Sequence, residues 1–255
     1  MVVCVPTDDL GFDLSLTDPT RIVSLVPSLT EALARTVPER LVGATDWCTH
    51  PPDLDVARVR GTKNPDVEAI VALRPDLVVA NEEENRLVDL DLLRAAGVPI
   101  WVTDIRTVRG GLMSLSRLFG ALGVRDVGWL ADAERAWADP ATVASQRSRA
   151  VVPIWRRPWM HVGSDTYAGD VLRRLGVDNV LADHDVRYPA IPLEELPTHD
   201  LVVLPDEPYA FSATDGPEAF DRPCALIDGR RLTWYGPAMV DAPQVLLAQL
   251  RAAIG

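Results

Sequence analysis

A continuous apolar strand between two polar loops, in the stretch from Arg60 to Arg86, most constrains how this chain can fold. The run LVVA at residues 77–80 lacks polar alternation, which is typical of a strand covered on both faces in a parallel sheet. Before it, VEAIVAL at residues 67–73 has apolar residues at helical spacing. Pro75 ends that helix because it disfavours the α conformation of the residue before it. The stretch therefore predicts a helix that leads into a buried parallel strand.

The same alternation of apolar strands and helices recurs on both sides of a helical middle segment. No strand pattern is visible between Val108 and Arg149, where residues 110–123 and 126–149 have helical patterns. Strands that alternate with helices favour parallel sheets with right-handed crossovers. We therefore predict an α/β fold of two Rossmann-like lobes joined by a long backbone α-helix. The expected domains are an N-terminal lobe at residues 1–107, connecting helices at 108–149 and a C-terminal lobe at 150–255.

Charge and cysteine content limit the partners and the compartment. The chain of 255 residues has a formal net charge of −12 and a pI near 4.7, which argues against nucleic acid or an anionic membrane surface as partner. Cys4, Cys48 and Cys224 lack the paired spacing of a disulfide framework, and reduced thiols fit the cytoplasm. The first residues do not have the pattern of a signal peptide, and no apolar run approaches the ~18 residues that span a bilayer. We expect a cytoplasmic protein without membrane insertion, or a periplasmic or lipid-anchored one if an upstream leader is missing.

Several segments together resemble one superfamily of ligand-binding proteins. They are RIVSLVPSLTEAL, DWCTHPPD, RGTKNPDVEAIVALRPDLVVA, WRRPWMHVGSDTYAGDVLRRLGVDNVLAD and RLTWYGPAMVDAPQVLLAQL. Their residues and order resemble the helical-backbone, class III periplasmic substrate-binding proteins, and most of all the cobalamin-binding proteins of cobalamin ABC importers. The resemblance implies a non-enzymatic protein that needs no cofactor. It implies capture of a metal chelate, a cobalamin-type corrinoid first and haem or a ferric siderophore as alternatives, in a cleft between the lobes.

Two departures concern transport. Importer components of this superfamily are secreted or lipid-anchored, whereas this sequence begins directly at the mature lobe. They also dock an ABC permease through an acidic residue on each lobe, and the matching position in the first lobe falls near Leu87. The run from Glu82 to Glu84 and the pair Glu194 and Glu195 are candidate replacements. The alternative is that these acids are solvated residues favoured by helix dipoles. A permease is thus an expected partner only if the protein is exported.

The candidate ligand-binding residues come from loops at expected strand ends and from the rim before the last helix. Aromatic side chains would contact a flat macrocycle with little loss of rotamer entropy, and polar ones would meet amide or phosphate groups. Lys63, the only lysine of the chain, could contact an anionic group, although a codon bias toward arginine is the favoured explanation for its being alone. The candidates are Ser28, Trp47, His50, Lys63, Asn64, Asn81, Glu82, Trp155, Trp159, Tyr167, Arg187, Tyr188 and Trp234.

The segment DWCTH offers a second possible chemistry. Asp46, Cys48 and His50 alternate, so in an extended chain they would point to one side and could ligate a soft or borderline metal. On that basis the alternative function is a cytoplasmic metal-dependent enzyme or metallochaperone on the same scaffold. The competing interpretation is a polar loop in which His50 caps a turn before Pro51. No G-x-S-x-G elbow and no Gly-rich phosphate loop occurs in the sequence, so we expect no enzyme of those classes.

Overall fold

The computed structural model describes residues 6–14, 18–144 and 146–254, and it contains two compact units. The first unit comprises the described residues up to Ile105 together with Arg109–Ala131 and Tyr235–Pro237. The second comprises Arg106–Val108, Asp132–Trp234 and the described residues from Ala238 onward. The expected connecting segment, residues 108–149, is therefore divided between the two units. Cys4 lies outside the described residues.

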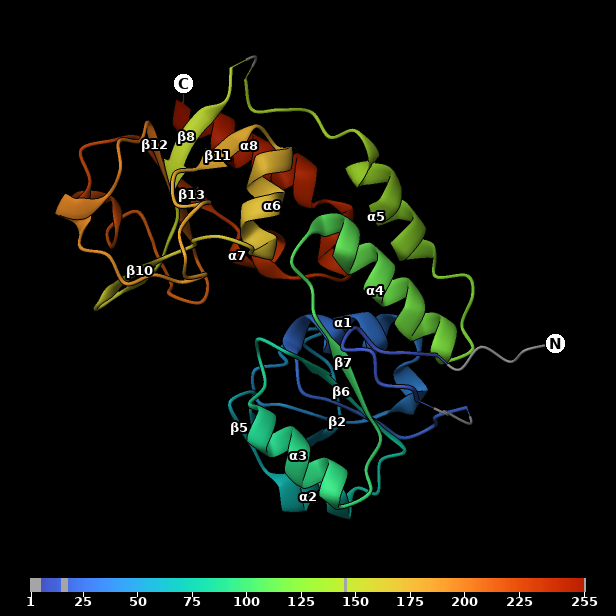
Figure 1. Cartoon of the computed structure of the whole chain (residues 1–255). Helices are drawn as coiled ribbons and strands as arrows, with labels where there is room; N and C mark the ends of the chain where they lie inside the picture. Colours follow the sequence, from blue (N-terminus) through green and yellow to red (C-terminus); the bar gives the residue numbers. More distant parts are fainter. Residues whose placement is uncertain (1–5, 15–17, 145, 255) are drawn as a thin grey trace. The chain divides into compact units, whose positions relative to one another are not determined.

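The first unit is built on a five-stranded parallel sheet in the order β3-β2-β1-β6-β7 (Figure 1). The order places β1 at the centre, and its three residues are all buried, as the apolar run RIVSLV predicts. A short antiparallel pair, β4 with β5, lies outside this sheet. The strands are β1 Ile22–Ser24, β2 Leu41–Ala44, β3 Ala57–Arg58, β4 Arg60–Gly61, β5 Asn64–Pro65, β6 Leu77–Asn81 and β7 Ile100–Thr103.

The helices of this unit begin and end where local chemistry dictates. In the sequence, Ser28 followed by Glu31 predicts a capping box with Ser28 as N-cap. This prediction is wrong: helix α1 begins at Pro27, whose fixed φ suits the first helical position, so Val26 is the N-cap and Ser28 lies inside the helix. Helix α2 is capped by Asp66, whose carboxylate accepts a hydrogen bond from Ala69 N–H at 3.0 Å. The helices are α1 Pro27–Thr36, η1 Pro38–Arg40, α2 Val67–Ala72, α3 Leu87–Ala95, α4 Val108–Ala121 and α5 Gly128–Ala138, which crosses into the second unit.

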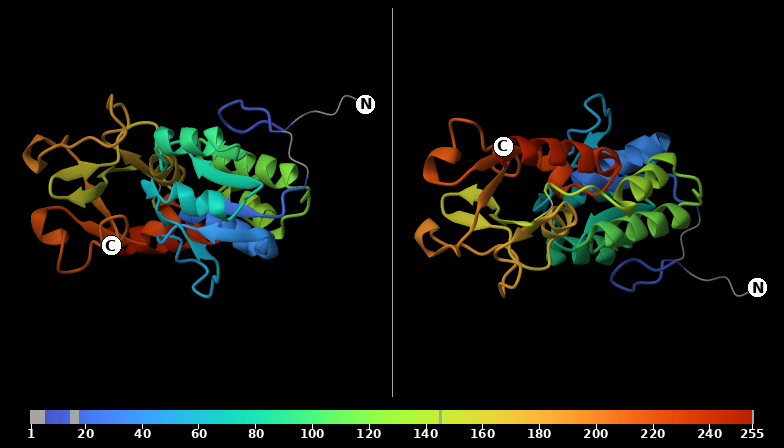
Figure 2. Two further views of the ribbon diagram at one scale, coloured as in Figure 1. Left: turned by 90° about the horizontal axis from the view of Figure 1, so that it is seen from below. Right: turned by 90° about the horizontal axis from the view of Figure 1, so that it is seen from above.

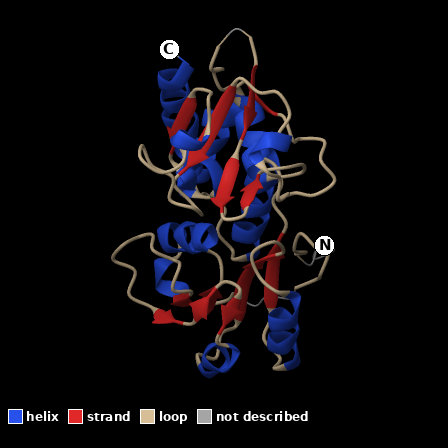
Figure 3. Cartoon of the chain, turned by 90° about the vertical axis from the view of Figure 1, so that its left-hand side faces the viewer, coloured by secondary structure: helices blue, strands red, loops and turns tan. Residues whose placement is uncertain are grey.

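Helices cover both faces of the first sheet. Figures 1 and 3 show α2 and α3 on one face and α1 on the other. Ile70 of α2 and Leu93 of α3 join Val23, Val78 and Ile100 of the strands in one buried apolar cluster. This two-sided burial explains why the strands read as continuous apolar runs.

The second unit contains a four-stranded parallel sheet in the order β11-β8-β12-β13. The antiparallel hairpin of β9 and β10 follows β8 directly, and it extends past the end of the sheet (Figure 1). The strands are β8 Ser148–Val151, β9 Pro153–Arg156, β10 Trp159–His161, β11 Val177–Asn179, β12 Leu201–Pro205 and β13 Cys224–Ile227. Two α/β units with parallel sheets confirm the predicted fold class.

The helices of the second unit pack on this sheet. Helix α6 contacts β11, and α8 contacts β13 along one face of the sheet (Figure 2). Thr166 caps α6 by accepting a hydrogen bond from Gly169 N–H at 3.2 Å, and Asp228 caps α7 through Arg231 N–H at 2.8 Å. The helices are α6 Tyr167–Arg174, η2 Leu193–Glu195, η3 Pro217–Ala219, α7 Gly229–Thr233, η4 Pro237–Val240 and α8 Ala242–Ile254.

Candidate functional site

The loops that follow the strands of the first unit form one rim. Because β1, β2, β6 and β7 are parallel, their carboxyl ends lie at the same edge of the sheet, where open α/β sheets bind ligands. The chain leaves these strands at Leu25, Thr45, Glu82 and Asp104. The predicted ligand residues of the first unit should therefore be exposed at this edge if they bind a ligand.

Trp47 is the most exposed indole of the chain. It follows β2, and 67% of its surface is exposed. A Cβ atom placed on Gly61 would lie 3.2 Å from Trp47 Nε1 and would collide with Asn64 Oδ1. The missing side chain of Gly61 thus lets Trp47 and Asn64 approach the β4–β5 turn together. Trp47, Asn64 and the neighbouring Lys63 are all exposed, so the structure brings these three predicted residues to one part of the rim.

Asn81, at the end of β6, is turned inward. Only 3% of its surface is exposed, and its amide nitrogen donates to Thr103 O at 3.0 Å and Thr103 Oγ1 at 3.1 Å. Its amide oxygen accepts hydrogen bonds from the backbone N–H groups of Glu83 and Glu84 at 3.0 and 3.2 Å. Asn81 therefore shapes the rim loop, and its amide is fully engaged in doing so.

The loop after β6 is tied to the β4–β5 turn. Lys63 Nζ donates to the carbonyl oxygen of Glu83, and Asn85 Nδ2 donates to Thr62 O at 3.0 Å. Burial raises the pKa of the Glu84 carboxyl, and the nearby charge of Lys63 opposes that rise. The exposed lysine thus joins two rim loops before any ligand arrives. Glu82 is exposed beside them.

The residues of the expected metal site do not converge. Among the described residues, no three His, Cys, Asp or Glu side chains are placed so that they could hold a metal ion. Cys48 is fully buried, and its sulfur lies 2.9 Å from Thr30 Oγ1 and 3.1 Å from Thr45 Oγ1. Burial raises the pKa of this thiol, which opposes the thiolate that metals require. Asp46 is exposed and His50 is half-buried, whereas Cys48 is buried. The three side chains therefore do not share one surface, although they alternate in the sequence.

The second unit presents aromatic residues at its own rim. Trp155, on β9, is 43% exposed. Trp159, on β10, is half-buried and packs against Phe211 and Phe220 at ring distances of 6.1 and 5.5 Å. The two tryptophans of the same hairpin thus have different surroundings: Trp155 lies at the surface, and Trp159 joins the apolar core.

Three other predicted ligand residues are buried. Ser28 is 4% exposed within α1. Tyr167 and Trp234 are 6% and 9% exposed, and the hydroxyl of Tyr167 donates to Trp234 O at 3.5 Å. Trp234 Nε1 donates to Glu207 Oε2 at 3.1 Å, and burial raises the pKa of that carboxyl. Burial likewise raises the pKa of the Tyr167 hydroxyl. Tyr167 and Trp234 therefore support the interior of the second unit in this structure.

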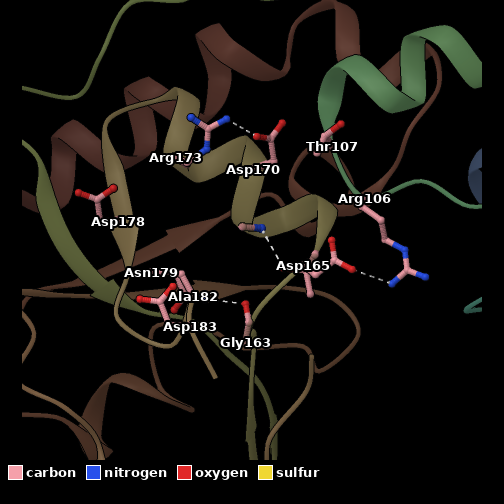
Figure 4. Close-up of a pocket in the computed structure, with 12 residues that line it drawn as sticks. Arg106, Thr107, Gly163, Asp165, Asp170, Arg173, Asp178, Asn179, Ala182 and Asp183 are labelled. Atoms are coloured by element: carbon pink, nitrogen blue, oxygen red, sulfur yellow. Dashed lines mark hydrogen bonds and ion pairs between the residues drawn. The ribbon is translucent and has the colours of Figure 1, made fainter. Parts of the chain in front are cut away.

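A polar pocket of about 410 Å³ lies beside α6 in the second unit (Figure 4). It is enclosed by the start of α6, the loop after β11 and residues 106–107. Arg106 Nη1 lies 3.6 Å from Asp165 Oδ2 at its mouth, and Arg187 Nε lies 3.9 Å from the same oxygen. Asn179 donates to Val162 O at 2.8 Å. Its lining is mainly charged, with four aspartates, two arginines and Asn179, so it offers carboxylate acceptors and guanidinium donors.

The backbone next to this pocket is held closely. Gly163 N–H donates to Arg187 O at 2.6 Å, and a Cβ atom on Gly163 would collide with Val186 O. Arg187 and the adjacent Tyr188 are half-buried there. The glycine is thus required for the approach of the two chain segments, and this approach places Arg187 at the edge of the pocket.

Some residues that the structure brings to these sites are not among the candidates named above, although the loops at 104–107 and 206–209, which contain Arg106 and Tyr209, were expected to reach a ligand. Arg106, Asp178, Asn179 and Asp183 line the polar pocket. Tyr209 contacts Trp155 with the ring centroids 5.6 Å apart. The usable signals were the polar residues Asp178 and Asn179 at the end of β11 and an aromatic residue in the proline-bounded loop after β12. Both positions lie at or just beyond the carboxyl end of a parallel strand.

Comparison with known proteins now adds to this geometry. Residues 22–201 match the model of a family described as periplasmic binding protein. This chain belongs to that family. The match confirms the predicted superfamily, and it agrees with the expectation of a binding protein and not an enzyme. Among the described residues, no helix is long and apolar enough to cross a membrane.

Several relatives of the chain are described as vitamin B12-binding or haem-binding proteins. A vitamin B12-binding protein of Vibrio cholerae is 27% identical over 182 residues, which cover 69% of this chain and 66% of the relative, just under two thirds of its length. The crystal structure of the periplasmic vitamin B12-binding protein BtuF of Vibrio cholerae has a TM-score of 0.73 at 20% identity, over 93% of this chain and 98% of that one. The periplasmic haem-binding protein BhuT in complex with two haems has a TM-score of 0.74 at 25% identity, over 92% and 99%.

Proposed function

We propose that this chain captures a metal chelate, a cobalamin-type corrinoid, without transforming it and without a cofactor of its own. The observation that carries the proposal is the exposure of Trp47, which follows β2 of the first parallel sheet, and of Trp155, on the hairpin that follows β8 of the second. Exposed indoles offer large flat contact area at little entropy cost, which suits the face of a macrocycle. Relatives that bind vitamin B12 or haem support the same class of ligand.

Charge favours a corrinoid over haem. A cobalamin-type corrinoid bears neutral amide side chains and one phosphodiester, whereas haem bears two carboxylates. The chain has a net charge of −12, and Asp46, Glu82 and Asp165 are exposed at the two rims. A polar pocket with carboxylate acceptors and guanidinium donors suits amides, because each amide can donate and accept. Haem remains the second candidate because BhuT, a haem-binding protein, is 25% identical. Delivery of the ligand to an ABC permease stays a prediction from the family resemblance.

Titration of the purified chain tests the proposal. We expect cyanocobalamin to bind with a dissociation constant of about 1 μM or lower, measured by quenching of tryptophan fluorescence and by equilibrium dialysis. Trp47→Ala should weaken binding about tenfold or more, because an exposed aromatic anchor is lost. Phe12→Ala is the matched control: Phe12 is a 53% exposed aromatic outside both rims, so its loss should leave affinity unchanged.

Two further titrations separate the candidate ligands. Haemin and a ferric siderophore are added to the same protein under the same conditions. Tight binding of haemin with no binding of cyanocobalamin would replace the corrinoid by haem. Absence of binding to all three ligands at micromolar protein would overturn the proposed function.

A further inference from the structure

Five aromatic side chains form a continuous array at the rim of the second unit. Trp155 and Tyr209 meet edge to face with centroids 5.6 Å apart, and Tyr209 lies 4.7 Å from Phe211. Phe211 stacks on Trp159 at 6.1 Å with an interplanar angle of 4°, and Trp159 meets Phe220 at 5.5 Å. The array runs from the core, where Phe211 is 4% exposed, to the surface, where Trp155 is 43% exposed. Its outer end is the pair Trp155 and Tyr209.

A charged network fixes the orientation of that outer pair. The hydroxyl of Tyr209 donates to Asp215 Oδ2 at 2.6 Å. Asp215 and Glu218 both form ion pairs with Arg156, whose guanidinium lies 5.5 Å from the ring centroid of Trp159. The Arg156 side chain is only 19% exposed, so these pairs are partly shielded from solvent. Tyr209 therefore has a fixed ring plane before any ligand binds, which reduces the entropy cost of binding.

The same network engages the guanidinium of Arg156 within the second unit. Arg156 pairs with two carboxylates, Asp215 and Glu218, so it is held away from a ligand by its own partners. The exposed Arg157 lies in the turn of the same hairpin, and beside it the exposed indole of Trp155 and the half-buried ring of Tyr209 form an apolar surface. Such a surface attracts an uncharged planar face by dispersion and by removal of apolar area from water.

We propose that Trp155 and Tyr209 together form a preorganised aromatic platform for the flat face of the macrocycle, and that Arg156 and Asp215 are its positioning residues. This inference rests on the proposed function, because it assumes that a macrocyclic chelate is the ligand. The inference goes beyond the proposed function because it assigns Tyr209 a role in ligand affinity. That role depends on the hydrogen bond from Tyr209 to Asp215, which orients the ring.

Variants of the full-length chain test the platform, with cyanocobalamin and haemin as probes. Trp155→Ala and Tyr209→Ala should each lower affinity about tenfold or more, and Phe12→Ala should not lower it. Tyr209→Phe keeps the ring and removes only the hydrogen bond to Asp215, so affinity should fall about threefold to tenfold. The melting temperature of the ligand-free Tyr209→Phe protein should stay within about 2 °C of the wild type, which separates positioning from folding.

A double-mutant cycle completes the test. If Asp215 acts on the ligand through Tyr209, the losses in Tyr209→Phe and Asp215→Asn should be less than additive in the double variant. Wild-type binding of either probe, together with unchanged affinity in Trp155→Ala and in both Tyr209 variants, would overturn the platform and leave the proposed function intact. Wild-type protein that binds neither probe would overturn the proposed function itself.

Discussion

The carboxylate of Asp170, on α6, accepts a hydrogen bond at 2.9 Å from the backbone N–H of Val108, the first residue of α4. That N–H is one of the four donors that an α-helix leaves without an internal partner. Burial alone would raise the pKa of Asp170, but the hydrogen bonds from Val108, Arg173 and Arg174 outweigh burial and lower it. A side chain from another helix thus caps the start of α4.

Replacing Asp170 by Asn should destabilise the protein by about 1–3 kcal/mol at neutral pH, because a buried charged acceptor of three donors is lost. Asp132→Asn is the matched control, since its partner Arg135 is on the same helix and both are half-exposed or more. The control should change the free energy of unfolding by less than about 0.5 kcal/mol. Urea unfolding measures both. Equal effects of the two substitutions would show that Asp170 is an ordinary surface charge.

The pKa shift of Asp170 also gives a direction in pH. A carboxyl whose pKa is lowered on folding adds stability above its unfolded pKa, and that stability disappears as the pH falls through the folded value. The difference in stability between wild type and Asp170→Asn should therefore shrink on acidification below about pH 4. A difference that stayed constant across this range would contradict the ionised role of Asp170.

The fold was predictable wherever one short segment carried the whole signal. Strands β6 and β12 read as apolar runs, and the structure places them at Leu77–Asn81 and Leu201–Pro205. The start of α1 was not placed correctly, because Ser28 and Glu31 matched a capping pattern while Pro27 set the actual first position. Two local signals competed there, and the stiffer backbone preference prevailed.

The site was only partly predictable because exposure depends on contacts distant in sequence. Trp47 and Trp234 are both aromatic residues in loops or at helix ends, yet Trp47 is 67% exposed and Trp234 is 9% exposed. The difference arises from partners such as Glu207, which lies 27 positions before Trp234 and binds its indole N–H. Asn81 is likewise turned inward by Thr103, on the neighbouring strand. Sequence spacing indicates which residues follow a strand, and the fold decides which of them face solvent.

For Glu207 we expect the opposite dependence of stability on pH from that of Asp170. Burial raises its pKa, and the hydrogen bond from Trp234 opposes that rise. Stability from a carboxyl with a raised pKa is present below its unfolded pKa and is lost as the pH rises through the folded value. Glu207→Gln keeps an acceptor for Trp234 without the charge, so it should raise the melting temperature by about 1–3 °C at about pH 7. The gain should vanish near pH 4, at about the unfolded pKa.

Glu195→Gln is the control for that experiment. Glu195 is exposed in η2, so the substitution removes one charge without changing a buried environment. Its melting temperature should follow the wild type at both pH values. A loss of stability in Glu207→Gln at neutral pH would show that the charge of Glu207 stabilises the fold.

We expect the replacement of Asn81 to destabilise the protein at the rim of the first unit. Asn81→Ala leaves the N–H groups of Glu83 and Glu84 without the oxygen that accepts their hydrogen bonds, whereas Thr103 O keeps the hydrogen bond from Glu82 N–H. We expect a loss of about 1–3 kcal/mol in the free energy of unfolding, measured by urea denaturation. Asn64→Ala, an exposed amide on the neighbouring turn, should cost less than about 0.5 kcal/mol. If the two variants are equally stable, Asn81 does not hold the loop.

We expect the thiol of Cys48 to be unreactive in the native protein. In a Cys4→Ser, Cys224→Ser variant, Cys48 is the only remaining cysteine. Its thiol is fully buried between Thr30 and Thr45, and burial raises its pKa, so a disulfide-exchange reagent should not modify the native protein. Modification should be complete in denaturant, and its rate should follow that of unfolding. The same protein dialysed against zinc should retain no more metal than a further Cys48→Ala variant. Rapid modification of the native state, or zinc retained only when Cys48 is present, would restore the metal site at Asp46, Cys48 and His50.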